Sequence, residues 1–399
     1  MLESQSIFEF TLHYLAPVGA VMLLGLLGGK IARKIGLPKV TGYIITGLLI
    51  GPSVFSLISF ETVKSMSLIN DIALGLILFA IGGSFEIHHI RTIGRKVLWL
   101  TLGQSLGVML FVTGSLYAVG MDLYTATLIG TIAIATAPAA TLLVVREFQA
   151  KGDFTDTMIT VVGTSNVVCI LAFELVFGIG QLQKDTGFFM ALLGPLYEIG
   201  GSLVIGFGLG YLIAKWEQHV EDQAEMLMII LAGVLLVTGL SRTLGLQPLF
   251  AALIMGAVTT NLSLMHRLVY AELRGVEQPI YIAFFVIAGA SLHLEFLPAL
   301  GLAGFAYLIA RVAGKALGIY VIARWKKYSP DVANYLGIGI VVQAGVAIGL
   351  VENVSEVNPE LGAIVTPLIL ASILIYETFG PPLIKYVLIK VGDVKAVEE

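Results

Sequence analysis

Two basic residues lie inside an apolar stretch of the sequence. Arg311 is in the middle of the run from Phe296 to Ile322, and Lys315 follows four residues later. A charge at the depth of the bilayer centre costs a few kcal/mol on insertion scales and roughly 10 kcal/mol or more in simulations. Such a side chain normally faces a partner or a wet cavity. Arg311 is therefore the best single pointer to a buried polar site.

A second candidate site is the segment Thr136-Ala137-Pro138-Ala139-Ala140-Thr141, which interrupts an apolar run. Proline removes a helix donor and clashes with the preceding turn, and its small neighbours leave the backbone free to unwind. A shift of 206 positions leads to Val342-Gln343-Ala344-Gly345-Val346-Ala347, which is also small and holds one amide. Paired interruptions indicate a midplane binding site, where half-helix ends bind a cation or an anion. The alternative is that Pro138 only kinks a helix and Gln343 bonds to a neighbour.

The composition is that of a polytopic membrane protein, so the lipid bilayer is an expected partner. Hydrophobic residues make up 57% of the 399 residues and charged residues 13%, against about 45–50% and about 25% in soluble chains. The single cysteine, Cys169, excludes an intrachain disulfide and a multi-cysteine metal site. The net charge of −4 indicates no nucleic-acid partner. No nucleotide loop, metal-ligand cluster or positioned nucleophile is present, so we expect neither an enzyme nor a cofactor.

About twenty apolar residues are needed to span a bilayer as a helix. This length predicts an all-α membrane protein with thirteen transmembrane helices in one domain that covers residues 1–399. The predicted stretches are about 10–32, 38–58, 67–85, 95–119, 123–147, 155–180, 187–214, 224–243, 246–263, 278–293, 296–323, 331–352 and 362–389.

The distribution of basic residues predicts the orientation of these helices. One set of alternate loops and the C-terminal tail holds 18 Lys and Arg residues, whereas the other set holds only Lys64, Lys184 and Arg242. Cytoplasmic loops carry the excess of positive charge. We therefore expect a multi-pass protein of the cell membrane with its N-terminus outside and its C-terminus in the cytoplasm, which requires an odd number of helices.

A weak internal repeat occurs at one shift. Leu78-Phe79-Ala80-Ile81-Gly82-Gly83 is similar to Phe284-Phe285-Val286-Ile287-Ala288-Gly289, and Leu48-Leu49-Ile50-Gly51 is similar to Leu253-Ile254-Met255-Gly256. The shift covers seven helices, so the copies have opposite orientations, as in many secondary transporters. We predict two inverted six-helix repeats, about 10–180 and 224–390, joined by a linker helix at about 187–214, with crossed, discontinuous helices 5 and 12.

Several segments resemble the monovalent cation/proton antiporter superfamily, the sodium/hydrogen exchanger-like transporters. They are Gly36-Leu37-Pro38-Lys39-Val40-Thr41-Gly42-Tyr43 with Gly51-Pro52, Leu78 to Glu86, Ala135 to Glu147, Phe284 to Leu294, and Gln343-Ala344-Gly345. The resemblance implies a core domain, here about 95–180 and 296–390, that moves against a scaffold formed by the remaining helices. It also implies a homodimer.

The sequence departs from the family at its ion site. The family carries one or two aspartates on helix 6, whereas Ser165 and Asn166 stand at the matching positions here. Both offer oxygens to an ion or solute, and we expect a monovalent cation near Asn166, but neither titrates at physiological pH. The chain thus resembles an atypical member of the family that lacks the helix-6 aspartate.

Arg311 matches the family's basic residue on helix 11, which often pairs with a site carboxylate. Three partners remain open: a buried acid such as Glu174 or Glu198, backbone carbonyls at a broken helix, or an anionic substrate. Arginine stays protonated in proteins. The candidates for coupling are therefore Glu174 and Lys315, although Lys315 has the alternative of snorkelling toward the cytoplasm.

Three functions follow from these observations. The first is secondary active transport that exchanges Na⁺ or K⁺ for H⁺ by alternating access, with an altered ion site. The second keeps the fold but transports a small anion or solute near Arg311, Ser165 and Asn166. The third is uncoupled transport. The absence of a helix-6 carboxylate counts against the first function and in favour of the second.

Overall fold

The structure, a computed structural model, describes residues 15–83, 85, 87–181, 188–220, 222–263, 279–292, 294 and 301–394. The described residues form helices and no strands. Residues 10–14, 296–300, Glu86 and the basic residues Lys184, Arg267, Arg274 and Lys395, all used in the predictions above, lie outside this part of the chain.

The predicted all-α membrane fold is confirmed. The first half contains α1 (Leu15–Lys34), α2 (Lys39–Ile50), α3 (Phe60–Ser65), α4 (Ser67–Gly82), α5 (Ile87–Ala118), α6 (Leu123–Ile132), α7 (Pro138–Glu147) and α8 (Asp153–Gln181). The second half contains α9 (Phe188–Trp216), a 3-10 turn η2 (Glu217–His219), α10 (Gln223–Thr243), α11 (Pro248–Leu262), a short helix Pro279–Ala290, α13 (Gly301–Trp325), α14 (Pro330–Gly339), α15 (Gly345–Val357) and α16 (Pro359–Lys390).

Each predicted apolar stretch overlaps one helix or one pair of half-helices. Six helices among the described residues are long and apolar enough to cross a membrane alone: α5, α8, α9, α10, α13 and α16. The stretch predicted at 38–58 was too long, because α2 ends at Ile50. Gly51 there is extended and precedes Pro52, and a residue before proline disfavours the helical conformation. The total of thirteen crossings stays a prediction.

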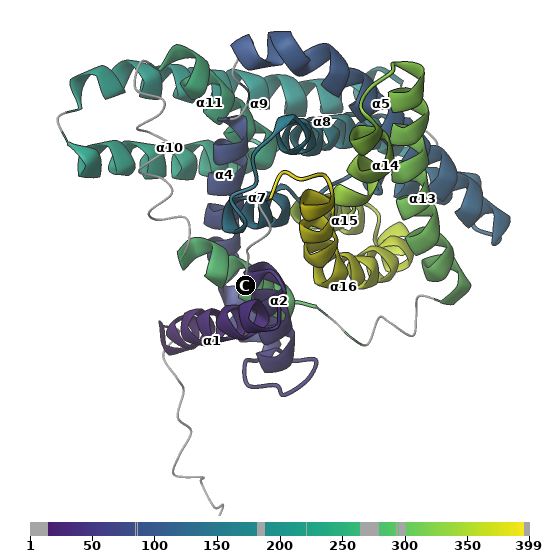
Figure 1. The fold of residues 1–399 in the computed structure, drawn as a ribbon, viewed down its shortest axis with the longest axis horizontal. Coiled ribbons are helices and arrows are strands. Elements are labelled where there is room, and N and C mark those ends of the chain that lie inside the picture. Colours follow the sequence, from purple (N-terminus) through teal and green to yellow (C-terminus); the bar gives the residue numbers. More distant parts are fainter. Residues whose placement is uncertain are drawn as a thin grey trace, which may run out of the picture.

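The helices form two groups around the centre of the molecule. In Figure 1, α9, α10 and α11 lie together on the left, whereas α5, α13, α14 and α16 lie on the right. The helices of each group contact one another, and α4 packs against α10 and α11. On the other side, α13 packs along α5 and against α14. The broken helices α6–α7 and α14–α15 belong to the second group.

Two close helix contacts, one between α4 and α11 and one between α2 and the helix at 279–290, depend on glycine. A methyl group on Gly256 of α11 would lie 2.0 Å from the carbonyl oxygen of Phe79 in α4. A methyl group on Gly289 would lie 2.2 Å from the carbonyl oxygen of Ile44 in α2. The shift of 205–206 positions relates α2 to α11 and α4 to the helix at 279–290. The predicted shift thus relates the two helix pairs, although the glycine lies on the copy of α2 in one pair and on the copy of α4 in the other.

Candidate functional site at two broken helices

Both predicted interruptions are present. Helix α6 ends at Ile132 and α7 begins at Pro138, while α14 ends at Gly339 and α15 begins at Gly345. Pro138 occupies the first turn of α7, where its missing N–H costs no hydrogen bond. The two non-helical links meet, since the Ala137 N–H donates to the carbonyl of Val342 at 2.9 Å. The structure thus brings four half-helix ends to one place.

Arg311 lies at this meeting point and is fully buried. Its three hydrogen bonds run to the carbonyl oxygens of Ala133 (2.9 Å from Nε), Ala135 (2.7 Å from Nη2) and Val341 (2.5 Å from Nη1). The guanidinium also lies 4.4 Å from the ring centroid of Tyr376, in the range of a cation–π contact. One side chain therefore joins the links of both broken helices.

Of the three partners considered for Arg311, the structure supports the backbone carbonyls. Its three donated hydrogen bonds among the described residues go to main-chain oxygens, and none goes to Glu174 or Glu198. The last carbonyls of a helix lack intrahelical donors and carry partial negative charge. A fixed guanidinium satisfies them and is stabilised by them in return.

Lys315 is fully buried as well and does not snorkel. Its Nζ lies 3.0 Å from the carbonyl oxygen of Ile134 and 3.1 Å from Oε1 of Gln104 in α5. Residues four apart share one face of a helix, so α13 presents both cations to the same link. The alternative that Lys315 snorkels toward the cytoplasm was wrong, because Gln104 and the Ile134 carbonyl bind its ammonium group inside the protein.

Gln343 completes the capping of α6. Its Nε2 donates to the carbonyl of Ile132 at 3.1 Å, and its Oε1 accepts from the hydroxyl of Tyr307 at 3.0 Å. The successive carbonyls of residues 132 to 135 thus all accept from side chains: Gln343, Arg311, Lys315 and again Arg311. Gln343 thus has the bond to a neighbour that the alternative predicts, and it also lies in the link between α14 and α15.

Asn166 holds the first link against α8. Its Oδ1 accepts from the Thr136 N–H at 3.0 Å, and its Nδ2 donates to the Thr136 carbonyl at 3.1 Å. The Thr136 hydroxyl donates to the Val162 carbonyl at 3.0 Å, and the Ser165 hydroxyl donates to the Val161 carbonyl. Asn166 and Thr136, both candidate site residues, thus contact each other, but their polar atoms are bound to the backbone. An amide oxygen has a second lone pair, so a cation near Asn166 stays a prediction.

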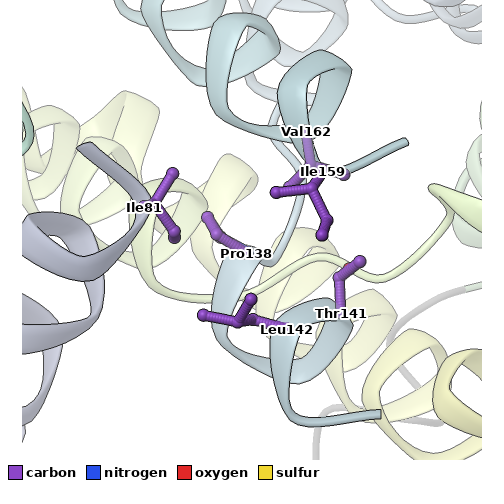
Figure 2. A pocket seen from close by; sticks show the side chains of 6 residues that line it. All are labelled: Ile81, Pro138, Thr141, Leu142, Ile159 and Val162. Atoms are coloured by element: carbon purple, nitrogen blue, oxygen red, sulfur yellow. The ribbon is translucent and has the colours of Figure 1, made fainter. Parts of the chain in front are cut away.

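Pro138 and Thr141 line a narrow gap beside the link (Figure 2). The gap has about 170 Å³ of empty space but is too narrow to hold a free water. Its walls come from α4, α7 and α8, with Ile81, Leu142, Ile159 and Val162 as the other lining residues. It therefore borders both helix groups, since α4 belongs to the group of α10 and α11.

The sequence did not single out three side chains of this site. Gln104, Tyr307 and Tyr376 hold Lys315, Gln343 and Arg311, respectively. Tyr307 lies one turn before Arg311, and Gln104 is a polar residue in an apolar run, so position and polarity were the available signals. Glu174, the other coupling candidate, lies elsewhere on α8 and is described below. No group of three or more His, Cys, Asp and Glu residues that could hold a metal occurs in the described part of the chain.

Comparison with known proteins is consistent with this arrangement. The sequence matches the family described as sodium/hydrogen exchanger, transmembrane, over residues 19–385. It is 21% identical to a Na(+)/H(+) antiporter of Enterococcus hirae, over 94% of this chain and 98% of that one. It is 22% identical to the Na(+)/H(+)-K(+) antiporter GerN of Bacillus cereus, over 95% and 96%.

A solved structure shares the fold. The sodium proton antiporter MjNhaP1 of Methanocaldococcus jannaschii superposes with a TM-score of 0.74 at 19% identity, covering 97% of this chain and 99% of that one. The family match extends over most of the chain and includes both broken helices. The protein therefore belongs to the transmembrane sodium/hydrogen exchanger family, within the monovalent cation/proton antiporter superfamily.

Proposed function

We propose that the protein is a secondary active transporter that exchanges Na⁺ or K⁺ for H⁺ by alternating access. The observation that carries this proposal is the meeting of two broken helices at the buried guanidinium of Arg311. Discontinuous helices at midplane depth are the usual site of ions in secondary transporters. Two relatives across nearly the whole length, from Enterococcus hirae and Bacillus cereus, are named as antiporters of Na⁺ and H⁺.

The core domain, about 95–180 and 296–390, would move against a scaffold formed by the remaining helices, and the protein would act as a homodimer. The two helix groups of Figure 1 support this division, as does the narrow gap at Pro138 and Thr141 between α4 and the core helices α7 and α8. Opening of that gap would give an ion a path from one side of the membrane to the broken helices. The distribution of Lys and Arg supports an external N-terminus and a cytoplasmic C-terminus.

The ion site of this transporter differs from the family pattern. Arg311 and Lys315 already occupy the carbonyl oxygens that end α6, and Asn166 is bound to Thr136. A transported cation near Asn166 would add to the second lone pair of its amide oxygen. It would arrive beside the basic side chains of Arg311 and Lys315, so release of a proton from a nearby group would favour its binding. We keep Lys315 and Glu174 as the groups that release this proton.

The alternative of a small anion or solute receives less support from the geometry. An anion at Arg311 needs donors that are free to reach it, but the guanidinium donates to three carbonyls and its face is covered by Tyr376. An anion would have to displace those carbonyls. Cation exchange is therefore the function that the site supports best.

Transport by the full chain in proteoliposomes that contain a trapped pH dye tests this function. An imposed Na⁺ or K⁺ gradient should drive proton movement in the opposite direction. Substitution Lys315→Met should abolish it, whereas Lys327→Met, at an exposed position beyond the same helix, should not. Cation flux that leaves the internal pH unchanged would refute exchange, and uptake of an anion without proton movement would favour the alternative.

A further inference from the structure

A second buried acidic site lies between α8 and α9. Glu174 of α8 is 5% exposed, and one of its carboxylate oxygens, Oε1, has no hydrogen-bond partner. Glu198 of α9 acts on it electrostatically, and the Gln247 side chain is within reach. Gln247, at the start of α11, donates from Nε2 to Oε2 of Glu198 at 3.2 Å. Two carboxylates and one amide therefore meet at one point.

Two of these three residues belong to one fixed unit. The Gln247 N–H donates to the hydroxyl of Ser202 at 3.0 Å, and that hydroxyl lies 3.2 Å from the Gln247 carbonyl. Ser202 is one turn from Glu198 on α9, so it fastens the start of α11 to the turn that carries Glu198. Glu174 alone reaches this unit from another helix, α8, which packs against α9.

The cluster has an excess of negative charge. Several helices pack against α8. Among their described charged residues, Glu198 is the one that acts electrostatically on Glu174. No basic side chain in that part of the protein acts on either carboxyl group. Two carboxylates that share a poorly solvated site resist being ionised together, and they titrate as a pair. One positive charge between them removes the repulsion.

We propose that Glu174 and Glu198 form a binding site that takes either one proton or one monovalent cation of the Na⁺ or K⁺ class. The unpartnered Oε1 of Glu174 and the carboxylate of Glu198 are its acceptors, and the Gln247 amide orients Glu198. This inference deepens the proposed function, on which it rests for its role in exchange, because it supplies the titrating group that Ser165 and Asn166 lack.

The exchange at this site is balanced in charge. When a cation binds, the O–H bond of the protonated carboxyl breaks and its proton goes to water on the same side, so the net charge of the pair is unchanged. If α8 moves with the core while α9 and α11 stay with the scaffold, the two carboxylates separate. Each then ionises independently of the other, and the pair loses its affinity for the shared charge. Movement and proton binding would be linked in this way.

Infrared difference spectroscopy of the purified full-length chain tests the site without transport. NaCl or KCl replaces choline chloride at neutral pH, and the signal of protonated carboxyl groups is recorded. In the wild-type protein this signal should fall when the cation is added. Glu174→Gln and Glu198→Gln should each abolish the change, while Glu377→Gln should keep it. Glu377 is a matched control because it is also buried and has an unpartnered carboxylate oxygen, but on α16.

The possible results separate this site from the proposed function. A carboxyl response that persists in both Gln variants, or that disappears only in Glu377→Gln, overturns the inference. Glu198 is only half-buried, so Glu198→Gln carries the test even if Glu174→Gln fails to fold. A wild-type protein that shows the response yet exchanges no cation for protons in liposomes supports the site and refutes the proposed function. Exchange without any carboxyl response would support the proposed function and refute the site at Glu174 and Glu198.

Discussion

Removal of the Arg311 side chain should destabilise the protein strongly, because this guanidinium satisfies three buried carbonyl oxygens. In Arg311→Ala each oxygen loses its donor, and a buried unsatisfied polar group costs about 1–3 kcal/mol. Three such groups give a loss of about 3–9 kcal/mol, before the cavity left by the side chain is counted. At the low end this corresponds to a fall in melting temperature of roughly 4 °C for a chain of 399 residues.

The assay is thermal unfolding in detergent, followed by size-exclusion chromatography of heated samples. Arg324→Ala is the matched control, because Arg324 lies on the same helix but is exposed. The melting temperature of Arg311→Lys should lie between those of Arg311→Ala and Arg324→Ala, since one ammonium group cannot reach both links as a guanidinium does. If Arg311→Ala melts at the same temperature as the Arg324→Ala control, the carbonyl contacts do not stabilise the meeting point of the two broken helices, and the reasoning is refuted.

Three further outcomes are expected. Asn166→Asp places a titrating group in the link, so Na⁺ binding measured by calorimetry should become dependent on pH; binding that is equal at acidic and alkaline pH would contradict this. Gly256→Ala should lower the yield and melting temperature of folded protein because its methyl group would meet the Phe79 carbonyl, whereas Gly239→Ala, with open space around it, should be tolerated; equal behaviour of the two would argue against the close contact. Cys169 is buried with its thiol on the Thr131 carbonyl, so a maleimide should modify it only after denaturation, and rapid labelling of the folded protein would be inconsistent with this packing.

The backbone features of the site could be predicted from the sequence. Pro138 and the small residues around Gly345 weaken two helices locally, and the predicted repeat relates these two positions to each other. The depth of Arg311 in an apolar run was also sufficient to identify it as a buried polar group. Local composition controls where a helix breaks, and the sequence reports local composition directly.

Side-chain partners were less predictable, because they depend on how helices far apart in the sequence rotate against one another. Lys315 was a case of this kind: snorkelling and burial are equally compatible with its position on α13, and the choice depends on Gln104 of α5. The electrostatic interaction between Glu174 and Glu198 depends in the same way on the packing of α8 against α9. In the sequence, Glu174 is a candidate for coupling and both residues are candidate partners of Arg311, but nothing there pairs the two with each other.

The two glycine contacts limit how the helices that make them can deform. At Gly256 and Gly289 main chain touches main chain, so no side chain is present whose rotamer could absorb a small displacement. A shear of α4 along α11, or of α2 along the helix at 279–290, would have to break the fit along its whole length at once. We therefore expect the two helices of each pair to respond to changes in bilayer thickness by tilting together, and the boundaries of each pair with its other neighbours to take up the strain.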